Sequence, residues 1–228
     1  QNTIKGQHAN AFGDGNDAYG KQTQSFGDGN KVYANESIGY GIKNQIGTQP
    51  SDAKSPKATR EADTNTNSAS VFGLNNTVVG NNILTLGKDN KITDTSTTNA
   101  NALGTSSLAV GTGAQAKQDS AVAIGNDSNA TAKSSVALGE STNATAVFAT
   151  AVGDSATASG VRSFAAGLNS KAQSDDSIAI GANTSSTVRG ISIGAEASAY
   201  HQGISVGYKS NASGIGSIAT GVGTSASG

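Results

Sequence analysis

The 228-residue chain has no cysteine, methionine or tryptophan, only 2 prolines, and aromatic residues at 4%. The absence of cysteine excludes disulfides, thiolate chemistry and cysteine-ligated metals. A globular domain of this length draws its core from Leu, Phe, Met and Trp, which are scarce or missing here. Hydrophobic residues make up 35% of the chain, and many of them are alanines. A single large core therefore lacks the side-chain volume to offset the cost of ordering the backbone, about 1–2 kcal/mol per residue.

Charge is also scarce. Charged residues make up 14% of the chain, with 15 basic against 16 acidic residues and a formal net charge of −1. Without a basic excess to neutralise phosphates, we expect neither nucleic acid nor lipid headgroups as partners. Disordered chains are typically richer in charge and poorer in β-branched residues, whereas Val, Ile and Thr recur here at regular places. The composition therefore predicts a repeat structure with a thin core of small residues.

Long hydrophobic runs are missing as well. No apolar run reaches the roughly 18 residues of a membrane span, so we expect no direct membrane insertion by this stretch of chain. An initiator Met and a signal-peptide pattern are also lacking, and we expect a mature or excised part of a longer protein.

What the chain does have is 30 glycines, and many of them mark a repeat. Blocks from residue 120 to 189 share the pattern S-x-h-A-h-G, where h is apolar, with a 14-residue period. Self-similarity at a fixed period is the signature of a solenoid. The marker glycines are Gly13 and Gly27, Gly73 and Gly87, and then Gly111, Gly125, Gly139, Gly153, Gly167, Gly181, Gly194, Gly207 and Gly221.

Each block of the repeat has two halves. In the first, Val122 and Ile124 alternate with alanines, which is the periodicity of a strand, and Gly125 ends it. In the second, Ala130 and Ala132 indicate another short strand after a polar turn. Glycine at least once per block, with Ser, Thr and Asn between, excludes helix. We therefore expect coils of two short strands and two turns that stack, with a ladder of Val, Ile and Leu inside.

Three blocks carry a family motif: SAVAIGNDS (Ser120 to Ser128), SSVALGEST (Ser134 to Thr142) and DSIAIGANTS (Asp176 to Ser185). They resemble the head-repeat motif S-V-A-I-G-x-x-S of YadA-like trimeric autotransporter adhesins, and the 14-residue period matches together with the motif. The resemblance is strong over residues 105–228 and weaker over residues 1–43 and 69–104.

The resemblance implies an all-β fold, a left-handed parallel β-roll (a β-solenoid) of about 14-residue coils, assembled as a side-by-side homotrimer. It implies an adhesion head that binds host extracellular-matrix proteins or host cell-surface receptors, with autoaggregation, biofilm formation and a role in virulence. It places this head on the bacterial cell surface, anchored in the outer membrane through a C-terminal region that this sequence does not contain. It implies no cofactor and no enzyme activity.

A strip of alanines offers a physical counterpart to the trimer. These side chains are too small and apolar for a solvated strand face, so we expect them to pack against neighbouring chains. The candidate trimer-facing residues are Ala121, Ala123, Ala137, Ala151, Ala165 and Ala179.

The first half of the chain departs from the period. We expect one repeat head domain over residues 1–228, made of N-terminal coils (1–43), an inserted loop (44–68), irregular coils (69–111) and regular repeats (112–228). Insertions in a solenoid project from one face and often bind ligands. The candidate ligand-binding residues in the loop are Lys54, Lys57, Arg60, Glu61 and Asp63. The alternative is a tolerated excursion, since doubling the length of a loop costs only about 0.6 kcal/mol.

Other residue patterns favour structural roles. The segments GDGN at Gly13 and Gly27 resemble pieces of a calcium-binding nonapeptide, but their 14-residue spacing favours turns at equivalent corners. Three phenylalanines that precede marker glycines, Phe12, Phe26 and Phe72, are expected in the core. Tyr19, Tyr33 and Tyr40 lie outside that register, and packing is favoured over receptor contact. His8 and His201 are too far apart on a solenoid to share a site within one chain.

No constellation of catalytic residues occurs, so we expect no enzyme. Two other functions stay open: an ice-binding β-solenoid and a purely structural spacer. An ice-binding face needs a regular Thr-x-Thr ladder. In the first of the corresponding triplets, Ala130-Thr131-Ala132, alanines stand where the two threonines would be needed.

Overall fold

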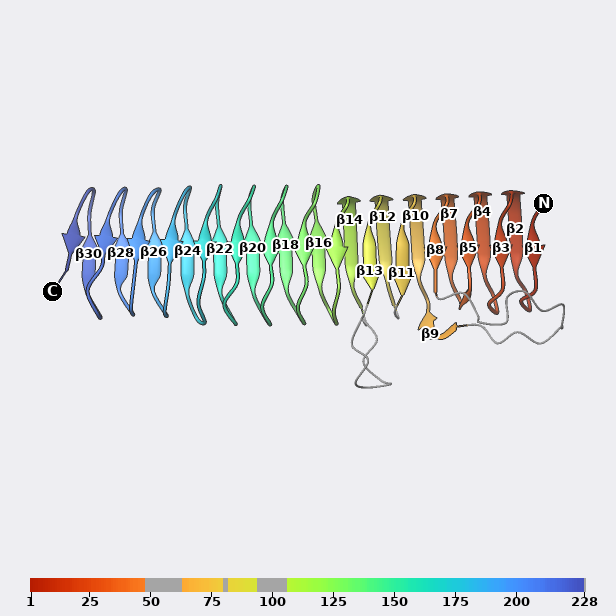
Figure 1. Ribbon diagram of the computed structural model, residues 1–228, viewed down its shortest axis with the longest axis horizontal. Helices are drawn as coiled ribbons and strands as arrows, with labels where there is room; N and C mark the ends of the chain where they lie inside the picture. Colours follow the sequence, from red (N-terminus) through yellow and green to blue (C-terminus); the bar gives the residue numbers. More distant parts are fainter. Residues whose placement is uncertain (48–62, 80–81, 94–105, 228) are drawn as a thin grey trace. The chain divides into compact units, whose positions relative to one another are not determined.

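The computed structural model describes residues 1–47, 63–79, 82–93 and 106–227, which consist of short parallel strands joined by turns (Figure 1). No helix occurs among these residues, and none therefore meets the length and hydropathy of a membrane span. The chain divides into two compact units, Gln1–Ser120 and Ala121–Gly228. In each unit two parallel sheets alternate along the chain, so the predicted all-β solenoid is confirmed.

We call these two sheets of each unit the front sheet and the back sheet. In the first unit the front sheet has the order β2 (Asn10–Asp14), β4 (Gln24–Asp28), β7 (Ile38–Ile42), β10 (Ser70–Leu74), β12 (Leu84–Lys88) and β14 (Leu108–Thr112). Its back sheet has the order β1 (Thr3–Ile4), β3 (Asp17–Ala18), β5 (Lys31–Val32), β8 (Gln45–Ile46), β11 (Thr77–Val79), β13 (Lys91–Thr93) and β15 (Gln115–Ala116). A separate pair joins β6 (Ala34–Asn35) to β9 (Asp63–Asn67).

The second unit repeats the same plan with shorter front strands. Its front sheet has the order β16 (Val122–Ile124), β18 (Val136–Leu138), β20 (Thr150–Val152), β22 (Phe164–Ala166), β24 (Ile178–Ile180), β26 (Ile191–Ile193), β28 (Ile204–Val206) and β30 (Ile218–Thr220). Its back sheet has the order β17 (Asn129–Ala130), β19 (Asn143–Ala144), β21 (Thr157–Ala158), β23 (Lys171–Ala172), β25 (Ser185–Ser186), β27 (Ser198–Ala199), β29 (Asn211–Ala212) and β31 (Ser225–Ala226).

Stacking places each residue on its equivalent in the next coil. Ala137 pairs with Ala151 on the next front strand. The same register survives the first insertion, because Gly41 of β7 pairs directly with Gly73 of β10. The register of the front sheet is therefore the same on both sides of the insertion.

The interior of the second unit is lined by small residues. Ala121, Ala123, Ala137, Ala151, Ala165 and Ala179 all have 0% exposed area within the single chain. The flanking residues of the same strands, such as Val136 and Leu138, point outward and are partly exposed. The prediction that these alanines face a neighbouring chain is therefore wrong. The prediction that Val and Ile fill the interior is also wrong for this second unit.

The width of the coil explains this reversal. Ala144 of the back sheet is also fully buried, so alanines of the two sheets share the interior. Facing alanines let the two sheets lie closer together than the roughly 10 Å that larger interior side chains require. Strand alternation then puts the large side chains of the second unit outside.

The first unit has a larger core. Val71, Val78 and Ile46 have no exposed area, and Tyr33 is 2% exposed. A small residue faces the large ones, because a Cβ built on Gly39 would lie only 3.0 Å from Cγ2 of Val32.

The inserted loop is shorter than expected. Residues 44–47 belong to the coil: Asn44 is buried, and β8 places Ile46 in the core. On the other side, Asp63 begins β9, which pairs with β6. The candidate residues Lys54, Lys57, Arg60 and Glu61 lie outside the described residues, so their role in binding stays a prediction.

Candidate functional site

The front sheet of the first unit carries many apolar side chains on its outer surface, interrupted by polar residues such as Asp14, Asp28 and Lys88. Three rows of side chains run across its strands, because residues that alternate along each strand point outward. Exposed members include Phe12 at 58%, Tyr40 at 57% and Leu84 at 39%. Large apolar side chains gathered on one face mark an interaction surface.

The middle row of this face is a ladder of rings. Phe12 and Phe26 stack with centroids 5.0 Å apart, Phe26 and Tyr40 follow at 6.0 Å, and Tyr40 and Phe72 at 6.3 Å. The prediction that Phe12, Phe26 and Phe72 lie in the core is therefore wrong, because they precede marker glycines on the outward face. Tyr40 was expected outside this register, yet it precedes Gly41, which takes the marker position. Tyr33, by contrast, is buried, and its ring centroid lies 5.3 Å from that of Tyr19, with the two rings tilted by 50°.

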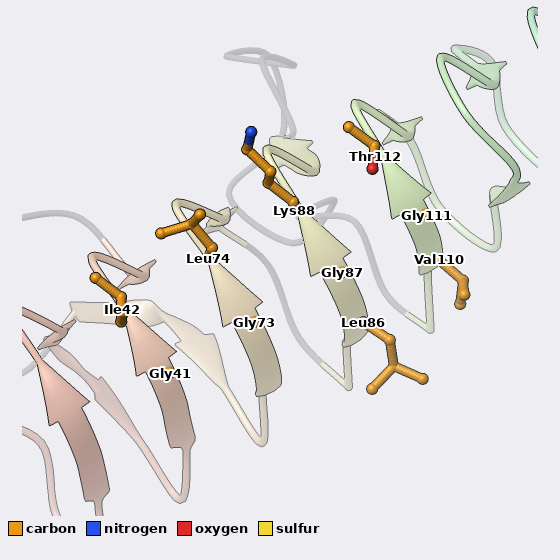
Figure 2. A pocket seen from close by; sticks show the side chains of 10 residues that line it. All are labelled: Gly41, Ile42, Gly73, Leu74, Leu86, Gly87, Lys88, Val110, Gly111 and Thr112. Carbon is orange, nitrogen blue, oxygen red and sulfur yellow. The ribbon is translucent and has the colours of Figure 1, made fainter.

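A groove of about 700 Å³ lies on the same face (Figure 2). Its floor is a column of marker glycines, which carry no side chains. Ile42, Leu74, Lys88 and Thr112 line one side, and Leu86 and Val110 line the other. The groove exists here because the five-residue front strands continue past the glycine, so side chains stand on both sides of the column.

The second unit has an apolar front surface of the same kind. Its outward residues include Ile124, Ile180 and Ile193, exposed by 37%, 36% and 39%. The back surfaces of the two units are different in character. Their outward rows hold residues such as Lys31, Gln45, Asn129, Asn143, Thr157 and Lys171. Each coil is therefore amphipathic across its thickness.

A ladder of buried asparagines stacks at the corners after Gly13, Gly27, Gly41, Gly73 and Gly87 in the first unit, and Ala114 follows it after Gly111. Nδ2 of Asn30 donates to Oδ1 of Asn16 at 3.1 Å and to the carbonyl oxygen of Gly41 at 2.7 Å. In turn, the backbone N–H of Asn44 donates to Oδ1 of Asn30 at 3.0 Å. Asn76 continues the ladder across the insertion by donating to Asn44. The sequence signal for this ladder is an Asn three residues after each of the first five glycines in this position, Gly13 to Gly87, and both GDGN segments contain it.

Ser or Thr takes this position in most coils of the second unit, and Ala156 and Ala197 take it in the other two. Oγ1 of Thr142 donates to the carbonyl oxygen of Gly139 at 2.7 Å, and Thr184 does the same to Gly181. At the opposite corner, Oγ of Ser135 donates to the carbonyl oxygen of Ala132 at 2.6 Å. In the S-x-h-A-h-G-x-x-S pattern, the residue at the first x, Ser135, and the residue at the last S, Thr142, both close corners.

One corner of the second unit carries an ion pair. Nε of Arg162 lies 2.7 Å from Oδ1 of Asp176. This guanidinium lowers the pKa of the Asp176 carboxyl, and the same hydrogen bond raises the pKa of Arg162. Any stabilisation from a lowered carboxyl pKa is lost as the pH falls through that pKa. Both groups are exposed, so the pair contributes little to stability.

Metal-ligating residues do not gather in the described part of the chain. Within it, no three His, Cys, Asp or Glu side chains lie close enough together to hold an ion. His8 and His201 belong to different units.

A comparison of the sequence with models of known protein families agrees with the motif and the coil geometry. Residues 102–128, 130–156, 158–184 and 201–224 match the family model described as YadA head domain repeat (2 copies). No curated protein matches the chain. The matches begin at residue 102 and end at residue 224, which spans more than half of the sequence. The chain therefore belongs to the YadA head domain repeat family.

Proposed function

We propose that the chain is the binding head of a trimeric adhesin on a bacterial surface, and that it attaches to host extracellular-matrix proteins or host cell-surface receptors. The family suggests an adhesin-type function and is not an enzyme family. The observation that best supports a trimer is the apolar front surface beside a polar back surface. Outer-membrane anchoring, autoaggregation and virulence belong to the same proposal.

The trimer places three left-handed rolls with their front surfaces toward a common axis. Exposed Leu84 and Leu86 would then leave water, as would the aromatic ladder. The back surfaces would face solvent, in keeping with their Lys, Gln, Asn and Thr side chains. In a three-fold ring, each chain contacts one neighbour through one edge of its front surface and the other neighbour through the opposite edge. The same contact, repeated three times, therefore closes the assembly.

Charge on the front surface should dissociate this trimer. Replacing Leu84→Glu and Leu86→Glu on β12 puts carboxylates where three chains meet, and we expect a monomer by sedimentation with an unchanged β-sheet spectrum. The matched control carries Thr77→Glu and Gln115→Glu on the outward row of the back sheet and should remain trimeric. A trimer that survives both charges, or a wild-type monomer, contradicts the proposed assembly.

Adhesion is tested on surfaces coated with solubilised host extracellular matrix and on cultured host cells. Weak contacts gain avidity when three chains bind together, so the front-surface variant should bind at least about tenfold more weakly than the trimer. A variant with residues 48–62 replaced by a Gly-Ser linker keeps β8 and β9 and tests the inserted loop. Absence of wild-type binding to either surface would contradict adhesion and favour a spacer, and thermal hysteresis would favour ice binding.

A further inference from the structure

The corner before each front strand in the second unit has an unusual backbone. At least one residue of each corner has positive φ, a conformation that residues other than Gly, Asn and Asp rarely adopt. Successive members of this column are Ser134, Phe148, Arg162, Asp176 and Arg189. The residues that hold this conformation elsewhere in the chain are mostly small or polar.

Two residues at this corner are poorly suited to their conformation. Phe148 has φ of 59° and Val188 has φ of 35°. Val188 and Arg189 are the central residues of a tight turn closed by the N–H of Gly190, which donates to the carbonyl oxygen of Thr187 at 2.8 Å. Turns with positive φ at both central residues favour Asn-Gly, and a β-branched residue there is strained.

Burial does not compensate for this strain. Phe148 is 55% exposed, Val188 is 42% exposed and Val147 is 37% exposed. Strained and exposed apolar residues serve neither packing nor solubility, and backbone strain of this kind tends to occur at binding sites. The corner therefore has the signature of a contact surface.

Charged residues lie along the same column. The N–H of Arg162 donates to the carbonyl oxygen of Val147 at 3.0 Å, which places Arg162 on the coil next to Phe148. Arg162 in turn forms the ion pair with Asp176 of the following coil. Nε of Arg189 lies 4.0 Å from Oδ2 of Asp176, beyond hydrogen-bond distance, and its side chain is 65% exposed. Arg189 therefore attracts the Asp176 carboxylate, while its exposed side chain can also contact a carboxylate of a partner.

The net charge of the corner also favours contact with a carboxylate. The cations along it are Lys133, Arg162 and Arg189, and the carboxylates are Asp175 and Asp176, which leaves one positive charge in excess. Asp175 is already engaged, because it accepts the N–H of Val161 at 2.8 Å. Asp176 is engaged by Arg162.

We propose that the corner patch, defined as Val147, Phe148, Arg162, Val188 and Arg189, binds an extended protein segment that carries a carboxylate between apolar side chains. Phe148 and Val188 would contact the apolar side chains, and Arg189 would bind the carboxylate. Aromatic and arginine residues are the usual main contributors to protein binding. This proposal rests on the proposed adhesion function and names the chemistry of its partner.

The test uses substitutions that should stabilise the chain while weakening binding. Phe148→Asn and Val188→Asn place a residue that tolerates positive φ at each corner, so we expect each to raise the thermal unfolding midpoint by about 2–4 °C. The control Ser155→Asn lies in the same conformation at the opposite corner, with φ of 57°, and should leave binding unchanged. Sedimentation of every variant reports whether the assembly is kept.

Two immobilised synthetic peptides serve as probes, one alternating Leu and Glu and the other alternating Leu and Lys. The full chain should bind the Glu peptide at least about tenfold more tightly, and added salt should weaken this binding. Phe148→Asn, Val188→Asn and Arg189→Gln should each reduce it by about tenfold or more. Equal binding of both peptides, or binding that the three variants leave unchanged, overturns the proposal.

The same measurements separate this proposal from the adhesion function. Peptide binding without binding to matrix or cells supports the corner patch and contradicts adhesion. Matrix binding that the corner variants leave intact supports adhesion and contradicts the corner patch. Loss of the trimer in Phe148→Asn assigns that residue to contact between copies and overturns the proposal.

Discussion

Replacing Gly87→Ala should unfold the first unit. A Cβ on this glycine would lie 2.0 Å from the carbonyl oxygen of Gly111 on the next coil, and its φ of +124° is one that alanine avoids. The clashing atom is backbone held in the stacked sheet, so it cannot move aside without breaking the ladder. We expect a loss of more than about 4 kcal/mol in the free energy of unfolding, which places it among the most severe substitutions.

The control is Gly29→Ala in the same unit. Gly29 also has positive φ, +64°, but a Cβ there would meet only Cγ of Lys43 at 3.6 Å. We expect a loss of about 1 kcal/mol from the backbone conformation alone. Urea unfolding followed by circular dichroism, with amide exchange of β10 and β12, measures both. Similar losses for the two variants would show that conformation, and not coil stacking, requires the marker glycine.

The second large effect concerns the asparagine ladder. Asn30→Ala removes a buried side chain that donates to the carbonyl oxygens of Phe26 and Gly41 and accepts from the N–H of Asn44. Each buried backbone group left without a partner costs about 1–3 kcal/mol. The expected loss is therefore about 3 kcal/mol or more in the free energy of unfolding, measured by urea titration.

An outward asparagine provides the comparison. Asn129 of β17 donates to the carbonyl oxygen of Asp127 at 2.9 Å and to Oδ1 of Asn143 at 3.2 Å, but water replaces both contacts readily. Asn129→Ala should change stability by no more than about 0.5 kcal/mol. If Asn30→Ala is equally mild, the ladder is a consequence of the fold and contributes little to its stability.

Much of the fold could be predicted from the sequence because the repeat is local. The marker glycines, the polar turn after each of them and the alternation of Val122, Ala123 and Ile124 all lie within a few residues of one another. Stacking then follows, since a unit that cannot bury its own apolar residues must bury them against its copies. An insertion interrupts the 14-residue spacing of the sequence but does not change which residues pair between coils. Gly41, for example, still pairs with Gly73.

The candidate surfaces were less predictable. The alternation of large and small residues is the same whichever face points inward, so Ala137 and Leu138 could exchange roles in any reading of the sequence. Likewise, Phe148 and Val188 look like ordinary apolar residues until the backbone around them is known.

By itself, the sequence determined the period, the parallel two-strand coil and the membership in an adhesin-head family, because glycine, turn residues and strand alternation act over short distances. Only the tertiary structure decided which face is inside. That choice depends on how the side chains of the two sheets fit together. Coils of the first unit bury Val71 and Val78, whereas in the second unit Ala123 and Ala130 share the interior and Ile124 lies outside. The large side chains are therefore left on the surface, where another chain can cover them.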